Sequence, residues 1–174
     1  MQGLIPQGLV RKVITMETEK DFWHPPPKGF LKFNIDGASK GNPGTVSHGG
    51  VLRDENGNII FIFYCHLGRA TNNMAGLMEM EQCLEFLVQD NRQNVIIEAD
   101  SELIVNSVKK INWGTKPEKD SSNWRLIQVF QWIHNHLQSL RTVRFIHVRR
   151  MANKLANFLA NQGVTCTDNR VAKY

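Results

Sequence analysis

Two aspartates, Asp36 and Asp100, each stand at the end of an apolar run that is typical of a β-strand. Apolar and polar side chains alternate in residues 31–35, and residues 95–97 are continuously apolar. If the two strands are parallel neighbours, both carboxylates lie in the crevice at the carboxyl edge of the sheet, where open α/β sheets bind ligands. Carboxylate oxygens are the ligands that Mg²⁺ prefers, so we expect metal-assisted chemistry at this edge. An aspartate also begins turns for purely local hydrogen-bonding reasons, and this alternative stays open.

A glycine-rich segment follows the first aspartate. Gly37, Gly41 and Gly44, together with Pro43, predict a tight turn with an exposed backbone. A turn of this kind is about the size needed to hold a phosphate group. An acidic strand end beside a phosphate-sized turn favours nuclease chemistry.

Several further motifs occur in order along one stretch of the chain. They are WHPPP at 23–27, DGASKGNPG at 36–44, GGVLRD at 49–54, GRATNNMA at 68–75, EADS at 98–101, HVRR at 147–150, AN at 152–153 and LANFLA at 155–160. The set resembles the ribonuclease H-like family, especially the reverse-transcriptase-like, retrotransposon-type domains abundant in plant genomes. The resemblance implies an α/β ribonuclease H-like fold, with a five-stranded mixed sheet in the order 3-2-1-4-5 flanked by helices. It also implies cleavage of the RNA strand of an RNA–DNA hybrid, leaving 3′-hydroxyl and 5′-phosphate ends.

The resemblance further implies four carboxylates that hold two Mg²⁺ ions across one scissile phosphate. Two cations about 3.5–4 Å apart repel one another and need negatively charged ligands; together they activate the attacking water and stabilise the leaving oxygen. Carried over by position, the first acid is Asp36 and the third is Asp100, whereas the other two positions hold Gly76 and Asn157. Gly76 offers no ligand, and Asn157 keeps only a neutral oxygen. We therefore predict that binding of Mg²⁺, or of Mn²⁺ in its place, is weakened and that catalysis is impaired.

Glu79 lies three residues after Gly76, about one turn further along a predicted helix. It could supply a substitute carboxylate, but the turn displaces it by about 4.5 Å along the helix axis, and metal sites tolerate only small shifts of their ligands. The interpretation that the sequence favours is that Glu79, Glu81 and Glu85 form the solvated face of an amphipathic helix.

Four candidate nucleic-acid-binding residues, Arg69, Thr71, Asn72 and Asn73, stand just before the same helix. Free backbone amides and short polar side chains at such a position suit contacts to phosphates and to a minor groove. The resemblance implies that these positions contact an RNA–DNA hybrid. Thr71 or Asn72 could instead simply cap the helix, and capping is compatible with binding.

Composition sets limits on the class of protein. The chain has 174 residues, 41% of them hydrophobic, and a formal net charge of +5, which fits one globular domain with short extensions and is compatible with a polyanionic partner. Its 3 cysteines are widely spaced and suggest neither a disulfide framework nor a zinc site. We find no apolar signal segment and no run approaching the roughly 18 apolar residues of a membrane span. We therefore expect a nuclear or cytoplasmic protein that is not secreted and has no membrane partner.

The hydrophobic pattern predicts the elements that position these residues. Strands are expected over 30–36, 47–54, 59–66, 95–99 and 142–148, and helices over 72–89, 102–111, 122–140 and 152–162, the last ended by Gly163. The helix over 72–89 has a buried stripe formed by Leu77, Met80, Leu84 and Leu87. We divide the chain into an N-terminal arm or linker (1–22), a ribonuclease H-like domain (23–164) and a C-terminal tail (165–174).

Two classes of function follow from these observations. The first is a domain that binds an RNA–DNA hybrid or structured RNA and whose hydrolytic activity is weakened or lost, because Gly76 and Asn157 replace acids. The second is a non-catalytic protein-interaction scaffold of the same fold.

Overall fold

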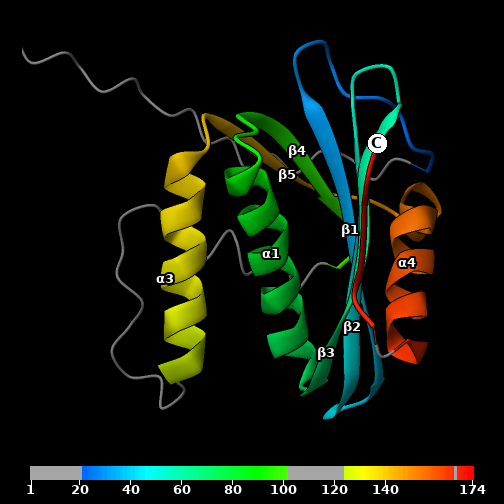
Figure 1. Cartoon of the computed structure of the whole chain (residues 1–174), viewed down its shortest axis with the longest axis vertical. Coiled ribbons are helices and arrows are strands. Elements are labelled where there is room, and N and C mark those ends of the chain that lie inside the picture. Colours follow the sequence, from blue (N-terminus) through cyan, green and yellow to red (C-terminus); the bar gives the residue numbers. More distant parts are fainter. Residues whose placement is uncertain (1–20, 102–123, 167) are drawn as a thin grey trace, which may run out of the picture.

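A computed structural model of the chain describes residues 21–101, 124–166 and 168–174. The strands are β1 (Leu31–Gly41), β2 (Gly44–Arg53), β3 (Ile59–Ala70), β4 (Asn94–Ala99), β5 (Thr142–His147) and β6 (Arg170–Lys173). The helices are α1 (Asn72–Gln89), α3 (Trp124–Ser139), the 3-10 turn η1 (Arg150–Asn153) and α4 (Lys154–Thr165). They form three layers, with α1 and α3 on one face of a central sheet and α4 on the other (Figure 1).

The described strands form one mixed sheet in the order β5-β4-β1-β2-β3-β6. Strand β1 pairs with β4 in parallel and with β2 in antiparallel orientation. From β3 to β5 the order is the predicted 3-2-1-4-5, so the ribonuclease H-like fold is confirmed. The predicted count of five strands is wrong, because residues 170–173 add β6 to the edge of β3. This strand has only four residues and is mostly exposed, so it leaves no alternating pattern in the sequence.

Strand β1 is longer than the sequence predicts. We expected it to end at Asp36, but it stays paired with β2 as far as Gly41, which lies opposite Gly44. The tight turn is present, but it is confined to residues 42 and 43 between Gly41 and Gly44. The prediction that the loop begins directly after Asp36 is wrong, because ladder hydrogen bonds keep residues 37–41 extended. On its other side, β1 is paired with β4 only as far as Ile35, opposite Ala99. Among the described strands, β1 therefore has a partner on one side only from Asp36 onward.

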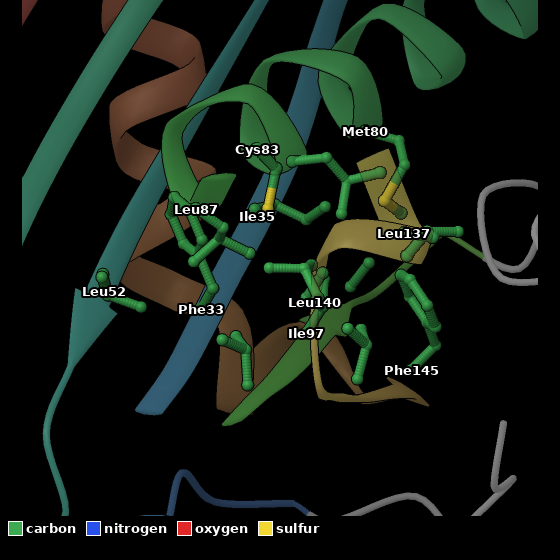
Figure 2. Packing of buried hydrophobic residues seen from close by; sticks show 14 of the residues in the cluster. Phe33, Ile35, Leu52, Met80, Cys83, Leu87, Ile97, Leu137, Leu140 and Phe145 are labelled. Carbon is green, nitrogen blue, oxygen red and sulfur yellow. The ribbon is translucent and has the colours of Figure 1, made fainter. Parts of the chain in front are cut away.

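The main hydrophobic core lies between the sheet and the layer of α1 and α3. In Figure 2, Phe33 and Ile35 of β1 pack with Met80 and Cys83 of α1 and with Ile97 of β4. Burying one such side chain stabilises the fold by about 1.5–3 kcal/mol. The predicted stripe on α1 is confirmed, since all four of its residues are buried. This stripe fixes which face of α1 meets the sheet.

Helix α4 lies close against β2 on the opposite face. A Cβ atom added to Gly49 would lie 2.4 Å from the backbone nitrogen of Ala160, so the helix can approach this closely only because Gly49 has no side chain. The Ser47 hydroxyl donates a hydrogen bond to the Ala160 carbonyl oxygen (2.5 Å). The helix end predicted at Gly163 is wrong, since α4 continues to Thr165 while Gly163 packs against Ser47.

The other predicted helices have clear counterparts. The helix over 72–89 is confirmed as α1, and those over 122–140 and 152–162 correspond to α3 and to η1 with α4. The helix predicted over 102–111 lies outside the described residues. Within the described ranges, no helix is both long enough and apolar enough to cross a membrane.

Candidate functional site

The candidate site lies where β4 ends and β1 continues. Asp36 of β1 is 6% exposed, and Asp100 directly follows β4. The structure brings the two carboxyl groups into hydrogen-bonding contact. Asn157 of α4 joins them: its Nδ2 donates to Oδ2 of Asp36 at 2.6 Å, while the backbone nitrogen of Gly37 donates to Oδ1 at 2.9 Å.

The environment of Asp36 favours its protonated form. Burial raises the pKa of Asp36 to about 7, and Asp100 acts in the same direction through its charge and through a hydrogen bond that requires a proton. The hydrogen bonds from Asn157 and Gly37 lower this pKa but do not cancel the shift.

The surroundings of Asp100 fix its backbone more than its carboxylate. Nε2 of His147, at the end of β5, lies 3.1 Å from the Asp100 carbonyl oxygen and donates to it. Nε of Arg150 is 3.8 Å from Oδ2 of Asp100, but the Arg150 side chain is 78% exposed, so this ion pair contributes little. The carboxylate of Asp100 remains available to a ligand.

A buried polar network positions α4 against β1. Nζ of Lys32 forms an ion pair with Oε1 of Glu98 at 2.6 Å, and both side chains are almost fully buried. Nδ2 of Asn34 donates to Oε2 of Glu98 at 2.9 Å and to Oδ1 of Asn153 at 3.2 Å. Asn153 in turn donates to the carbonyl oxygen of Ile35 at 2.8 Å. The start of α4 is thereby tied to β1 immediately before Asp36.

The contact between Asp36 and Asn157 repeats the contact between Asn34 and Asn153 one step further along. Two strand residues span about 6.6 Å and four helix residues rise about 6 Å, so the two spacings match. Nδ2 of Asn161 donates to Oδ1 of Asn157 at 3.3 Å, which leaves Nδ2 of Asn157 facing Asp36. Position 157 therefore presents an N–H donor, not a ligand oxygen, to Asp36.

Glu79 approaches the site from α1, on the opposite face of the sheet. Its side chain is fully buried, and neither carboxylate oxygen has a hydrogen-bond partner among the described residues. Its Oε2 lies 3.0 Å from the position that a Cβ atom on Gly37 would occupy. Burial raises the pKa of Glu79 well above its usual range, and the charges of Asp36 and Asp100 add to the shift. The prediction that Glu79 lies on the solvated face is therefore wrong.

A signal for this burial is present in the sequence. Glu79 lies four residues before Cys83, which lies four residues before Leu87, and both of these residues are buried. Glu79 thus continues the apolar stripe of α1. By contrast, Glu81 and Glu85 are partly exposed, as the amphipathic pattern predicts.

The four candidate nucleic-acid-binding residues lie at the junction of β3 and α1. Arg69 is exposed near the end of β3, and Asn72 and Asn73 are the first residues of α1. The Thr71 hydroxyl accepts a hydrogen bond from the backbone nitrogen of Met74 at 3.4 Å, so Thr71 caps the helix. Gly76, one turn before Glu79, brings no side chain to the site.

The sheet register places Arg69 at the same end of the sheet as the acids. Arg69 lies opposite Thr45, and Thr45 lies opposite Lys40, four residues beyond Asp36. At about 3.3 Å per residue, this corresponds to about 13 Å along the strand. The candidate nucleic-acid-binding residues and the acids are therefore brought to one edge but not into contact.

His48 is a residue that the sequence analysis missed. It is fully buried on β2 opposite Gly37, and neither ring nitrogen has a hydrogen-bond partner within the described part of the chain. Burial lowers the pKa of His48 to about 4, so the ring is neutral at physiological pH. It packs edge-on against Phe63, with 5.3 Å between the ring centroids. A histidine inside a strand gives no sequence signal that separates it from a surface residue.

Comparison with known proteins agrees with this geometry. A family profile described as reverse transcriptase-like matches residues 34–163. The chain belongs to this family. It is 38% identical over 139 residues to an Arabidopsis thaliana protein named "Putative ribonuclease H protein", a stretch that covers 80% of this chain but only 21% of that relative. It is also 27% identical over 157 residues to ribonuclease H of Bordetella avium, covering 80% of this chain and 93% of that protein.

Solved structures place this member of the reverse transcriptase-like family among the ribonuclease H folds. RNase H1 from the halophilic archaeon Halobacterium salinarum matches with a TM-score of 0.66 and 28% identity, covering 79% of this chain and 98% of that one. LC11-RNase H1 in complex with an RNA/DNA hybrid matches with a TM-score of 0.65 and 26% identity, covering 78% and 96%. This chain therefore carries a ribonuclease H-like domain.

The residues of the site fit a divalent cation only in part. Asp36 and Asp100 supply two carboxylates in contact, whereas Gly76 supplies no ligand and Asn157 turns an N–H group toward Asp36. In the ranges that the structure describes, no three His, Cys, Asp or Glu side chains are grouped so as to hold a metal ion. The remaining acid near the pair is Glu79, whose oxygens are unpartnered. The donor set therefore suits one cation better than two.

Proposed function

We propose that this domain binds an RNA–DNA hybrid, or structured RNA, along the sheet edge that carries Asp36 and Asp100, and that its hydrolysis of the RNA strand is weakened or lost. The ribonuclease H relatives support the nucleic-acid partner, among them the one whose structure contains a hybrid. The impairment rests on one observation, the hydrogen bond from Asn157 to Asp36. This bond places a donor where the family resemblance implies a metal ligand.

The residues of the chain have distinct tasks in this proposal. Asp36 and Asp100 would hold the cation, and a bound Mg²⁺ or Mn²⁺ would polarise the attacking water and stabilise the leaving oxygen. Asn157 and the Gly37 backbone orient the Asp36 carboxylate. The exposed Arg69 and the free amides at the start of α1 would contact phosphates beyond the acids.

Cleavage of a labelled hybrid in Mg²⁺ and in Mn²⁺, with RNA and DNA duplexes as controls, tests the impairment. We expect very weak cleavage by the unmodified chain. Gly76→Glu combined with Asn157→Asp should raise the rate on the order of 100-fold, and far more than either change alone, because both restored acids are needed to neutralise two cations. Robust Mg²⁺-dependent cleavage by the unmodified chain, abolished by Asp36→Asn, would contradict the proposal.

Hybrid binding measured at several salt concentrations tests the partner. Phosphate contacts release counterions, so the affinity should fall steeply as salt rises.

The protein-interaction scaffold is the second candidate function, and it is favoured by two exposed apolar side chains, Met151 at 53% and Phe158 at 58%. Absence of hybrid binding, or an affinity indifferent to salt, would favour the scaffold.

A further inference from the structure

The buried side-chain atoms that lack a hydrogen-bond partner in the described residues belong to two side chains, Glu79 and His48. Both lie next to Gly37. His48 faces Gly37 across the ladder of β1 and β2, and Oε2 of Glu79 lies 3.0 Å from where a Cβ atom on Gly37 would be. Glu79 thus occupies the space that any other residue at position 37 would fill. Position 37 immediately follows Asp36 in β1.

Glu79 and Asp36 lie on opposite faces of a segment of β1 that has no strand partner on one side among the described residues. Neighbouring strand residues point to opposite faces, so Asp36 points toward α4, and the face of Gly37 is turned toward α1. A strand beside β1 would separate these faces, but pairing with β4 stops at Ile35. From Asp36 onward, groups from both faces can meet around the side of β1 that has no strand partner in the described part of the chain. The charges of Asp36 and Asp100 already act on Glu79 there.

A proton does not solve the burial of Glu79. A protonated carboxyl group needs an acceptor for its O–H, and the described residues offer no hydrogen-bond partner to either oxygen. Burying such a group without a partner costs folding free energy, whether it is charged or neutral. A cation near three acids would supply the missing partner and reduce their mutual repulsion.

We propose that the Glu79 carboxylate is a ligand for a divalent cation that Asp36 and Asp100 also bind, and that it replaces the acid absent at Gly76. The proposal rests on the proposed function, because it completes the same site. In the structure, the three acids are not grouped around one point. Ligation therefore requires the Glu79 side chain to rotate from Gly37 toward Asp36, whose Cα atom is one residue, about 3.8 Å, away.

Mn²⁺ binding to the full chain without nucleic acid tests this proposal, using calorimetry and the electron paramagnetic resonance of free Mn²⁺. Glu79→Gln should weaken Mn²⁺ binding at least about tenfold, since losing even a residue that only orients a metal ligand costs about 10- to 100-fold. Glu81→Gln, on the same helix but partly exposed, is the matched control and should bind as the unmodified chain does. The variant Glu79→Ala with Gly76→Glu returns the acid by one turn and should restore the affinity. Circular dichroism should show that all variants are folded.

Equal Mn²⁺ affinity in the unmodified chain and in Glu79→Gln would overturn the proposal, as would an absence of Mn²⁺ binding to the unmodified chain. A purely structural role for Glu79 would change the melting temperature without changing the Mn²⁺ affinity, and would overturn it in the same way. Hybrid binding by the same variants in EDTA separates this inference from the proposed function. If the unmodified chain did not bind the hybrid but the Mn²⁺ results were as expected, the proposed function would be refuted and the inference about Glu79 would stand.

Discussion

The buried polar groups on the two faces of β1 differ in whether they have hydrogen-bond or ion-pair partners. On the α4 face, Lys32, Asn34 and Asp36 all have partners, in an ion pair or in hydrogen bonds to Asn153 and Asn157. On the α1 face, Glu79 and His48 are equally buried but have no hydrogen-bond partner in the part of the chain that is described. Satisfied buried groups hold a structure in one arrangement, whereas unsatisfied ones cost folding free energy. The α4 face thus serves as a rigid support. On the α1 face, a ligand could supply the hydrogen-bond or ionic partner that the buried groups lack.

The largest expected effect comes from removing one partner of a buried ion pair on the α4 face. Lys32→Met leaves Glu98 charged and buried, with a hydrogen bond from the Asn34 amide and the more distant charge of Arg53 in place of its ion pair, and should lower the free energy of unfolding by about 3–5 kcal/mol. Urea denaturation measures this loss. The double variant Lys32→Met with Glu98→Leu should recover most of it, because no uncompensated charge remains. A single variant as stable as the unmodified chain would show that the face is not a rigid support.

The next effect is expected at the boundary between the two faces. The pKa of Asp36, about 7 in the folded chain, lies above the unfolded value of 3.8, so the folded state binds the proton more tightly. The contribution of Asp36 to stability is then fully present below about pH 4 and is lost as the pH rises through 7. Asp36→Asn should therefore stabilise the metal-free protein at pH 8 by about 3 kcal/mol and have little effect at pH 4. Urea denaturation across this range would contradict the prediction if both proteins showed the same pH dependence.

A smaller effect with the opposite pH dependence is expected for His48. Its folded pKa of about 4 lies below the usual 6.5, so the unfolded chain binds the proton first and stability falls as the pH drops below 6.5. Between pH 7 and pH 5 this loss amounts to about 2 kcal/mol. His48→Leu should remove that part of the acid sensitivity. If both proteins lost the same free energy of unfolding between pH 7 and pH 5, an uncompensated burial of His48 would be refuted.

The smallest effect sharpens the role of Glu79. The Cβ atom added by Gly37→Ala displaces the end of the Glu79 side chain, which is flexible, so stability should change by less than about 1 kcal/mol. Its effect on Mn²⁺ affinity should nevertheless be measurable, and it should vanish when Glu79→Gln is already present. Additive effects of the two changes on Mn²⁺ affinity would mean that Gly37 and Glu79 do not act together.

Most of the strands and helices could be predicted from local pattern. Alternation in β1, the continuously apolar β4 and the stripe on α1 each show a period that the core enforces, whereas the strand order was predicted only from the family resemblance. The course of β1 beyond Asp36 could not be predicted, because its glycines have turn propensity and only the pairing partner decides. Strand β6 is likewise defined by the edge of β3 and not by its own residues.

The site could be predicted in its composition but not in its contacts. Asp36, Asp100 and Asn157 were identified by position, and the structure brings them together. The burial of Glu79 was missed because a charged residue on an apolar stripe is normally exposed, and the absence of a side chain at Gly37 is what makes room for it. His48 was missed because its burial depends on Phe63 and on the layer above it, which are remote in sequence.

The matched spacing of β1 and α4 has a consequence for how such a site can change. The next pair along, Ala38 and Asn161, forms no contact of this kind, because Ala38 has no polar side chain and Asn161 instead donates to the Asn157 carbonyl oxygen at 2.8 Å. On α4, position 157 is therefore the one that meets Asp36. On α1 the neighbouring turn faces a residue without a side chain, and an acid can move along the helix. One half of the site is thus fixed in place by geometry, while the other half can exchange its residues during evolution.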